Sequence, residues 1–150
     1  MKKIRIRQGE WVVVCDGTKA LILQNAGDEK FPNLQTREVL QHDDPPTHVQ
    51  GSAPPGRVQQ AVGTGSERSA VEQTDWHRQA EAQFLEKLMK RLDQAVMAGQ
   101  TKSLIIVAPP RALGVIRPHY SHALKAALRA EVDKDLVKLP VHEIERHLAA

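Results

Sequence analysis

Three carboxylates occupy positions where a metal-dependent nuclease would need them. Asp16 ends an apolar run, Glu38 lies in a later strand-like segment, and Asp75 precedes a long helical pattern. Two-metal chemistry requires several carboxylates that converge on ions about 3.5–4 Å apart. Each aspartate also has a sufficient local role, because Asp16 before Gly17 favours a turn and Asp75 can cap a helix. We therefore favour a turn and a cap, and predict no metal site.

Other reactive side chains lack the partners that catalysis requires. His77 lies near Asp75, but a histidine at the start of a helix is more often a surface residue. His119 and His122 are spaced to share a helix face, yet no cysteine or carboxylate ligand is close in sequence. Cys15 is expected to be a buried thiol, and no serine occupies a G-x-S-x-G turn. We predict no catalytic residue and no cofactor.

Nucleic-acid binding through the segment 43–74 is a second hypothesis. This segment has two arginines, Arg57 and Arg68, against four acidic residues. Lys and Arg contacts to phosphate supply essentially all non-specific affinity, so the segment alone would hold RNA poorly. Basic residues of the amino terminus or of the long helix would have to contribute: Lys2, Lys3, Arg5, Arg7, Lys87, Lys90 and Arg91. The alternative for the amino terminus is a basic segment that is simply solvated.

The composition is that of a globular chain with an aliphatic core. Of 150 residues, 41% are hydrophobic and 26% charged, while only 3% are aromatic. This length favours a single domain, and one cysteine excludes an internal disulfide framework. The net charge of +3 permits nucleic-acid binding without requiring it. The apolar run after the basic start is too short for a signal peptide, and no run approaches a membrane span. We predict a cytoplasmic protein.

The first part of the chain reads as an antiparallel meander. Residues 11–16 and 18–24 are apolar runs around the Asp-Gly pair, which would form a type I′ turn only if both residues take positive φ. Residues 34–41 alternate imperfectly and predict a third strand.

Segment 43–74 follows no helical or strand period. It contains four prolines and four glycines, and we predict a long, flexible loop. Loops of this length are uncommon in compact domains, and are usually functional or disordered. A solvated insertion without function is the alternative.

The second part alternates helices and strands. A helix starts at Thr74 or Asp75, carries apolar residues every four positions from Trp76, and stops at Gly99. Residues 103–108 predict a strand that is buried on both faces. A helix then follows from Pro109 and Pro110 to about Pro118. The remaining elements are a short helix to about 126, a strand to about 133 and a last helix that Pro140 opens.

The resulting order, β-β-β-α-β-α-β-α, predicts an α/β fold. A meander followed by helical crossovers gives a mixed sheet with helices on both faces and a long irregular loop before the central long helix. This is the connectivity of an RNase H-like domain, and right-handed crossovers leave few alternatives.

Four stretches carry a family resemblance: "PGR" (55–57), "DWHRQAEAQF" (75–84), "LIIVAPPRALGVIR" (104–117) and "EVDKDLVKLPVHEIERHL" (131–148). They resemble bacterial host attachment proteins, described as required for attachment to host cells. That family is distantly similar to the middle domain of archaeal and eukaryotic peptide-chain release factors. The resemblance implies an RNase H-like fold with a long loop before the long helix. In those factors the loop carries Gly-Gly-Gln and reaches the peptidyl-transferase centre of the ribosome.

This chain departs from the release factors in that loop. It has "GRVQQAVGTGSER" (56–68) and no Gly-Gly-Gln, so peptidyl-tRNA hydrolysis is not carried over to any residue. Adjacent glycines would let a backbone N–H approach the ester without a Cβ in the way.

We therefore expect a non-catalytic cytoplasmic factor that contacts the ribosome or RNA through segment 43–74 and the start of the long helix. A protein-interaction module needed only indirectly for host-cell attachment and a divergent metal-dependent nuclease are the alternatives. No membrane contact is expected. The predicted contact residues are Gly56, Arg57, Gln59, Gln60, Gly63, Gly65, Arg68, Asp75, Trp76 and His77.

Overall fold

The fold is described from a computed structural model that covers residues 3–42 and 55–149, with the backbone alone described from 55 to 75. Within these ranges, ten elements follow one another: β1 (Trp11–Cys15), β2 (Lys19–Asn25), β3 (Leu34–Gln41), α2 (Pro55–Met97), β4 (Leu104–Ala108), α3 (Pro110–Ile116), the 3-10 helix η1 (Arg117–His119), α4 (His122–Ala127), β5 (Leu128–Asp133) and α5 (Val141–Leu148).

The five strands form one mixed sheet in the order β3-β2-β1-β4-β5. β1 pairs with β2, and β2 with β3, in antiparallel fashion, whereas β1, β4 and β5 run parallel. The predicted combination of an antiparallel meander with later parallel strands is confirmed.

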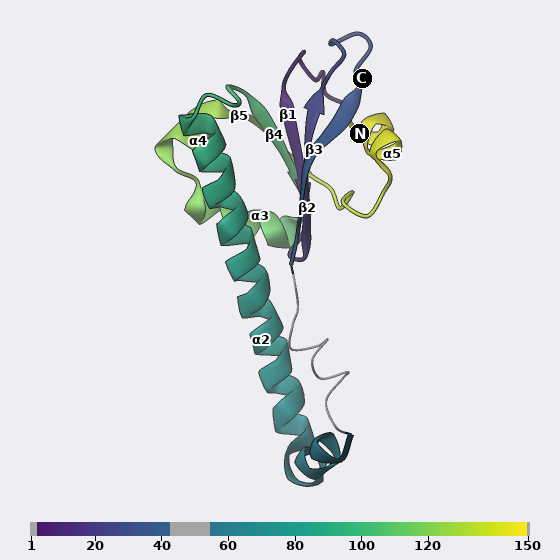
Figure 1. Cartoon of the computed structure of the whole chain (residues 1–150), viewed down its shortest axis with the longest axis vertical. Coiled ribbons are helices and arrows are strands. Elements are labelled where there is room, and N and C mark those ends of the chain that lie inside the picture. Colours follow the sequence, from purple (N-terminus) through teal and green to yellow (C-terminus); the bar gives the residue numbers. More distant parts are fainter. Residues whose placement is uncertain (1–2, 43–54, 150) are drawn as a thin grey trace.

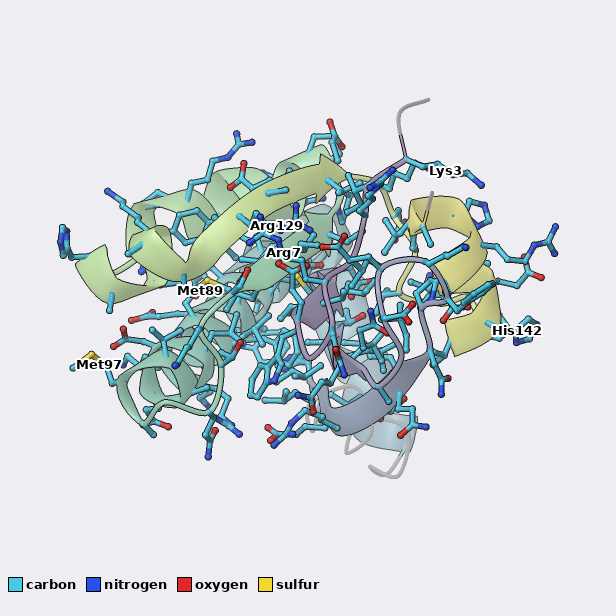
Figure 2. All side chains as sticks on the ribbon, turned by 90° about the horizontal axis from the view of Figure 1, so that it is seen from above. Lys3, Arg7, Met89, Met97, Arg129 and His142 are labelled. Carbon is cyan, nitrogen blue, oxygen red and sulfur yellow. The ribbon has the colours of Figure 1, made fainter. Side chains whose placement is uncertain are left out.

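Helices cover both faces of the sheet, as the sequence predicts (Figures 1 and 2). Because side chains alternate along a strand, neighbouring residues of β1 enter different cores. Val13 packs with α2, α3 and α4 in one core, and Val12 packs with α5 in the other. The central strands β1 and β4 are fully buried, which explains their uninterrupted apolar sequences.

The start of α2 differs from the prediction. The helix begins at Pro55, so the irregular loop predicted over 43–74 is helical from 55 onward, and residues 43–54 lie outside the described residues. Proline is favoured in a first helical turn, and the residues after it are rich in Gln, Glu, Arg and Ala, which are good helix formers. These propensities outweigh the glycines from which a loop was inferred.

The side chains of α2 are described from Trp76 onward, and among them packing on the sheet begins at Ala80. The buried side chains of this helix are Ala80, Phe84, Leu85, Leu88, Met89, Leu92 and Ala95. The first half extends well beyond the end of the sheet (Figure 1). In Figure 2, Met89 points toward the sheet while Met97 lies at the outer edge, in keeping with exposed fractions of 2% and 72%.

The carboxyl end of α2 is closed by a glycine, as predicted. Gly99 has a φ of 77°, in the left-handed region that favours glycine. Gly99 N donates to Val96 O, and Gln100 N donates to Ala95 O. This pair of bonds is the Schellman pattern and satisfies carbonyls that the helix leaves open.

Segment 110–133 also follows the prediction. α3 starts at Pro110, η1 follows it, and the chain forms the short helix α4 before the strand β5. Ser121 caps α4, because its Oγ accepts a hydrogen bond from Leu124 N at 3.0 Å.

The amino-terminal segment lies against α5. Ile4 forms a β-bridge with Ala149, and Ile6 is buried in the core beneath α5. Lys3 Nζ donates to Arg146 O at 2.8 Å. The basic start is thus attached to the fold. Within the described ranges, every helix falls short of the length and apolar character that a membrane crossing requires.

Candidate functional site

A cavity of about 570 Å³ lies at the carboxyl ends of β1 and β4. Asp16, Gly17 and Thr18 line it from the turn after β1, while Pro109 and Arg111 line it from the segment after β4. The chain leaves β1 toward β2 on one side and leaves β4 toward β5 on the other. Ligands in open α/β sheets bind at such a point of divergence, outside the carboxyl ends of the strands.

Asp16 organises the turn that forms one wall of the cavity. Its Oδ1 accepts hydrogen bonds from Thr18 N (2.8 Å), Thr18 Oγ1 (2.9 Å) and Lys19 N (2.9 Å). The predicted turn role of Asp16 is confirmed. The turn is not type I′, because neither Asp16 nor Gly17 has a positive φ and the connection has three residues between the strands.

Helix α2 also lines the cavity, through Arg78 and Glu81. A Cβ on Gly17 would lie 2.7 Å from Glu81 Oε2, so the missing side chain leaves room for this carboxylate. Arg111 Nη2 lies 3.9 Å from Glu81 Oε2, with the two side chains 66% and 35% exposed. The cavity therefore combines two arginines with two carboxylates, and part of their charge faces solvent.

The described residues give no support to a metal nuclease. Among them, no group of three or more His, Cys, Asp or Glu side chains is placed to hold a metal ion. Glu38 is paired instead with Arg91 of α2 at 3.0 Å. Asp75 lies inside α2 rather than at its start, so the predicted cap is wrong, and its side chain is outside the described part.

The remaining reactive residues are placed as follows. His119 belongs to η1 and His122 to α4, so they do not share a helix face as expected, and both are exposed. Cys15 is buried, as predicted, and burial together with the charge of Asp16 raises the pKa of its thiol to about 12. A thiol with this pKa is protonated at neutral pH and is a poor nucleophile.

Two of the ten predicted contact residues have described side chains. Trp76 is 40% exposed and its ring meets that of His77 edge-on, with 5.5 Å between centroids. His77 lies in the interior of α2, not in its first turn. The other eight residues have only their helical backbone described: Gly56, Arg57, Gln59, Gln60, Gly63, Gly65, Arg68 and Asp75.

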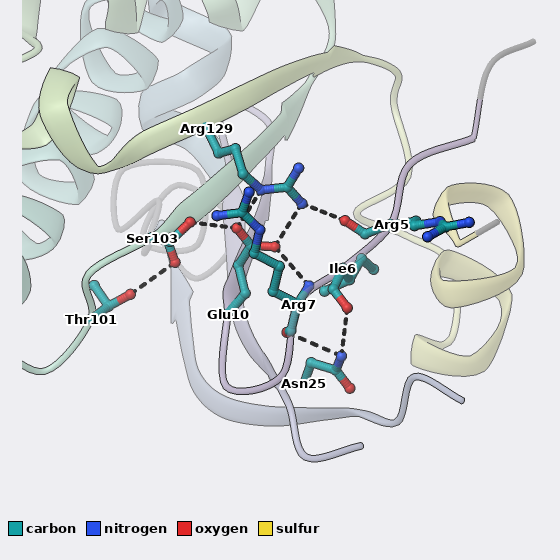
Figure 3. A network of polar contacts seen from close by, with 8 residues as sticks. All are labelled: Arg5, Ile6, Arg7, Glu10, Asn25, Thr101, Ser103 and Arg129. Carbon is teal, nitrogen blue, oxygen red and sulfur yellow. Dashed lines mark hydrogen bonds and ion pairs between the residues drawn. The ribbon is translucent and has the colours of Figure 1, made fainter. Parts of the chain in front are cut away.

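A buried charge network at the opposite end of the sheet was not predicted (Figure 3). The Glu10 side chain is 1% exposed, and its oxygens accept from Arg129 Nε (2.7 Å) and Nη2 (2.8 Å). Ser103 Oγ and the backbone N–H of Arg7 donate to the same carboxylate. Arg129 also donates to the carbonyl of Arg5. The network ties the amino-terminal segment to the starts of β1, β4 and β5.

The donors around Glu10 set its ionisation. Burial alone would raise the pKa of this carboxyl group, but the hydrogen bonds from Arg129, Ser103 and the Arg7 backbone outweigh burial and hold the pKa below its usual value. Glu10 is therefore a charged group inside the fold, stabilised by its neighbours.

A smaller network joins β5 to the segment before α4. Arg117 Nη2 pairs with Glu131 Oε1 at 2.8 Å, and Tyr120 donates to Glu131 Oε2 at 2.5 Å. Arg117 in particular holds the pKa of Glu131 below its usual value, and burial of Tyr120 raises the pKa of that phenol.

Sequence reasoning did not single out Thr18, Arg78, Glu81 or Arg111 as site residues. The signal in the sequence was the presence of two uninterrupted apolar runs, 11–15 and 104–108, which form neighbouring parallel strands. Their carboxyl ends must meet at one edge of the sheet, which places the residues that follow each strand together.

Comparisons with known proteins give two findings. The model of a family described as bacterial archaeo-eukaryotic release factor family 12 matches residues 10–148. The chain is also 37% identical over 65 residues to the uncharacterized protein RP470 of Rickettsia prowazekii (strain Madrid E). That alignment covers 42% of this chain and 43% of the Rickettsia protein.

Proposed function

The chain belongs to family 12 of the bacterial archaeo-eukaryotic release factors, and from this premise we propose that it is a non-catalytic factor of translation that contacts the ribosome or RNA. The contact is made by the segment 43–74 that the sequence singles out and by the residues that follow it in α2, up to His77. The projection of the first half of α2 beyond the sheet is the observation that carries the proposal (Figure 1).

The architecture supports an RNase H-like assignment for the whole of 1–150, treated as one domain. The strand order β3-β2-β1-β4-β5, in which β2 alone runs against its neighbours, agrees with that topology. Both cores lie on this one sheet, so nothing in the packing divides the described residues into two units.

Trp76 and His77 supply the chemistry of an RNA contact. An exposed aromatic ring offers a surface on which a base can stack, and such stacking tolerates any base. Arg78 and Lys87 follow on exposed positions of the same helix and can approach phosphate groups. Arg91, which the sequence offered as another RNA contact, is engaged by Glu38 and serves the fold.

The absence of Gly-Gly-Gln from the sequence supports the non-catalytic part of the proposal. A cytoplasmic location follows from a role in translation. Any effect on attachment to host cells would then be indirect.

Sedimentation with ribosomes tests the proposal. We expect tagged protein in the ribosomal fractions at low salt and its release as salt rises, since phosphate contacts weaken with ionic strength. Trp76→Ala should reduce this association several-fold. Phe31→Ala is the matched control, because Phe31 is also an exposed aromatic residue, at 71%, and lies on the β2–β3 turn. Protein confined to the free fraction at low salt would contradict the proposal.

A protein-interaction role is the second candidate, and a groove favours it. Residues of β3 and α2 line a cavity of about 530 Å³, among them Val39 of β3, which is 51% exposed, and Phe84 of α2. Nuclease digestion of the lysate separates the candidates. Complexes that survive digestion and are lost in Val39→Asp would favour the protein partner over RNA.

A further inference from the structure

The cavity at the carboxyl ends of β1 and β4 has a charge pattern that selects its ligand. Arg78 and Arg111 line it together with Asp16 and Glu81. A ligand that carried only negative charge would meet both carboxylates, and one that carried only positive charge would meet both arginines. A zwitterion satisfies both pairs, because like charges near one another are costly and opposite charges are favourable.

The polar groups of this cavity are available to a ligand. Arg111 and Glu81 stand 3.9 Å apart and both reach solvent, so their attraction to each other is weak. Within the part of the chain that the structure describes, the Arg78 side chain makes no hydrogen bond or ion pair. Asp16 uses Oδ1 for the turn, which leaves Oδ2 to accept from a ligand.

The short separation of Arg111 and Glu81 limits the kind of zwitterion. An α-amino acid holds its ammonium and carboxylate on one carbon atom, so both groups can face this pair at once. A ligand whose charges lie at the two ends of a long molecule cannot do so. The apolar part of the cavity, formed by Leu85, Ala112 and Val115, suits an aliphatic side chain. Ligand sites commonly occupy roughly 300–1,000 Å³, a range that includes this cavity.

We propose that this cavity binds a free α-amino acid with an aliphatic side chain. Arg111 and Arg78 receive the carboxylate, Glu81 and Asp16 Oδ2 receive the ammonium, and the side chain packs on Leu85 and Val115. The inference does not rest on ribosome or RNA contact: Arg78 is shared with the proposed phosphate contact, but the other five residues belong to the body of the fold.

Calorimetric titration of the full chain with leucine tests this proposal. We expect leucine to bind, and N-acetylleucine and leucinamide to bind at least about tenfold more weakly, because each lacks one of the two charges. Glycine should also bind more weakly, because it has no side chain for the apolar part. Bound leucine should raise the midpoint of thermal unfolding by mass action.

Variants locate the site. Arg111→Gln and Glu81→Gln should each weaken leucine binding at least about tenfold. Gly17→Ala should also weaken leucine binding, because the added Cβ would lie 2.7 Å from Glu81 Oε2 and displace this carboxylate. The φ angle of Gly17 is not positive, so alanine can adopt the same backbone conformation. Arg146→Gln is the matched control, since Arg146 is a 75% exposed arginine on α5, at the other face of the sheet.

The outcomes distinguish the alternatives. If N-acetylleucine or leucinamide binds as well as leucine, the cavity is a plain anion or cation site and the proposal is overturned. Absence of leucine binding at millimolar concentration overturns it as well. Trp76→Ala should leave leucine binding unchanged, so failure of the ribosome experiment and failure of this one can be told apart.

Discussion

At the amino ends of β1, β4 and β5 the carboxylate of Glu10 is buried and fully paired, whereas at the carboxyl ends of β1 and β4 the carboxylate of Glu81 is partly exposed to a cavity and loosely paired. Glu10 is held by Arg129, Ser103 and a backbone N–H. Among the residues that the structure describes, Glu81 has one distant partner, Arg111. Both glutamates face an arginine from another element, yet they differ in exposure, 1% against 35%.

The difference indicates which end of the sheet is structural and which can bind a ligand. A buried carboxylate is tolerated only if its neighbours satisfy it, and the four donors around Glu10 leave its oxygens no capacity for another molecule. The carboxyl end keeps charges that are incompletely paired. This arrangement contributes little to folding and leaves the groups free for binding.

The largest effect is expected at the amino end. Glu10→Ala should reduce the free energy of unfolding by about 3 kcal/mol, because it leaves Arg129 without a partner. This loss is at the lower end of the range for breaking a buried ion pair, since the Arg129 side chain remains 27% exposed. Urea unfolding measures the loss, and Glu143→Ala on the surface of α5 is the control. An effect below about 1 kcal/mol would contradict the structural role of the network.

Acid should weaken the same network. The pKa of Glu10 is lower in the folded protein than its ordinary value of 4.5, so its contribution to stability is complete above that value and is lost as pH falls through the lower folded pKa. The pKa of Glu131 is also lowered in the folded protein, so its contribution to stability is likewise lost in acid. The unfolding midpoint of the native protein should therefore drop on acidification, and Glu10→Gln should flatten this dependence. An identical pH profile for the two proteins would show that Glu10 is not involved.

Removal of the projecting part should cost little. Deletion of residues 46–70 is expected to change the free energy of unfolding by about 1 kcal/mol or less, since the described side chains of α2 first pack on the sheet at Ala80 and a shorter connection has a small entropic effect. The first turns of the remaining helix can unwind to close the connection. Thermal unfolding measures the change, and a loss of several kcal/mol would mean that this segment belongs to the core.

The smallest effect is expected at the carboxyl end. Glu81→Ala should change stability by less than about 1 kcal/mol, because its ion pair with Arg111 is long and exposed. Measured beside Glu10→Ala by urea unfolding, this variant tests the comparison directly. Equal losses for the two glutamates would remove the distinction between the two ends.

Local sequence patterns were sufficient for most of the fold. The strand predicted at 34–41 has the same bounds as β3. The strand predicted at 103–108 is β4, which begins one residue later, at Leu104. Apolar periodicity located the packed half of α2, and Gly99 located its end. The start of α2 was missed because proline and glycine are read as breakers, although Pro55 occupies the one helical turn that accepts it.

The two polar regions were beyond local reasoning for a different reason. Arg129 and Glu10 are separated by 119 positions, and no periodicity connects residues so far apart. The cavity residues come from the β1–β2 turn, α2 and α3, and they meet only when β1 and β4 pair in parallel. Asp16 was correctly assigned to a turn, yet that turn is also a wall of the cavity.

The continuity of α2 has a mechanical consequence. With 43 residues it is about 65 Å long at 1.5 Å per residue. The helix is held on the sheet by its second half, and among its described side chains Ala80 is the first that is buried. Arg78 and Glu81 lie beside Ala80 and line the cavity, so a force on the projecting end of α2 would shift these two cavity residues.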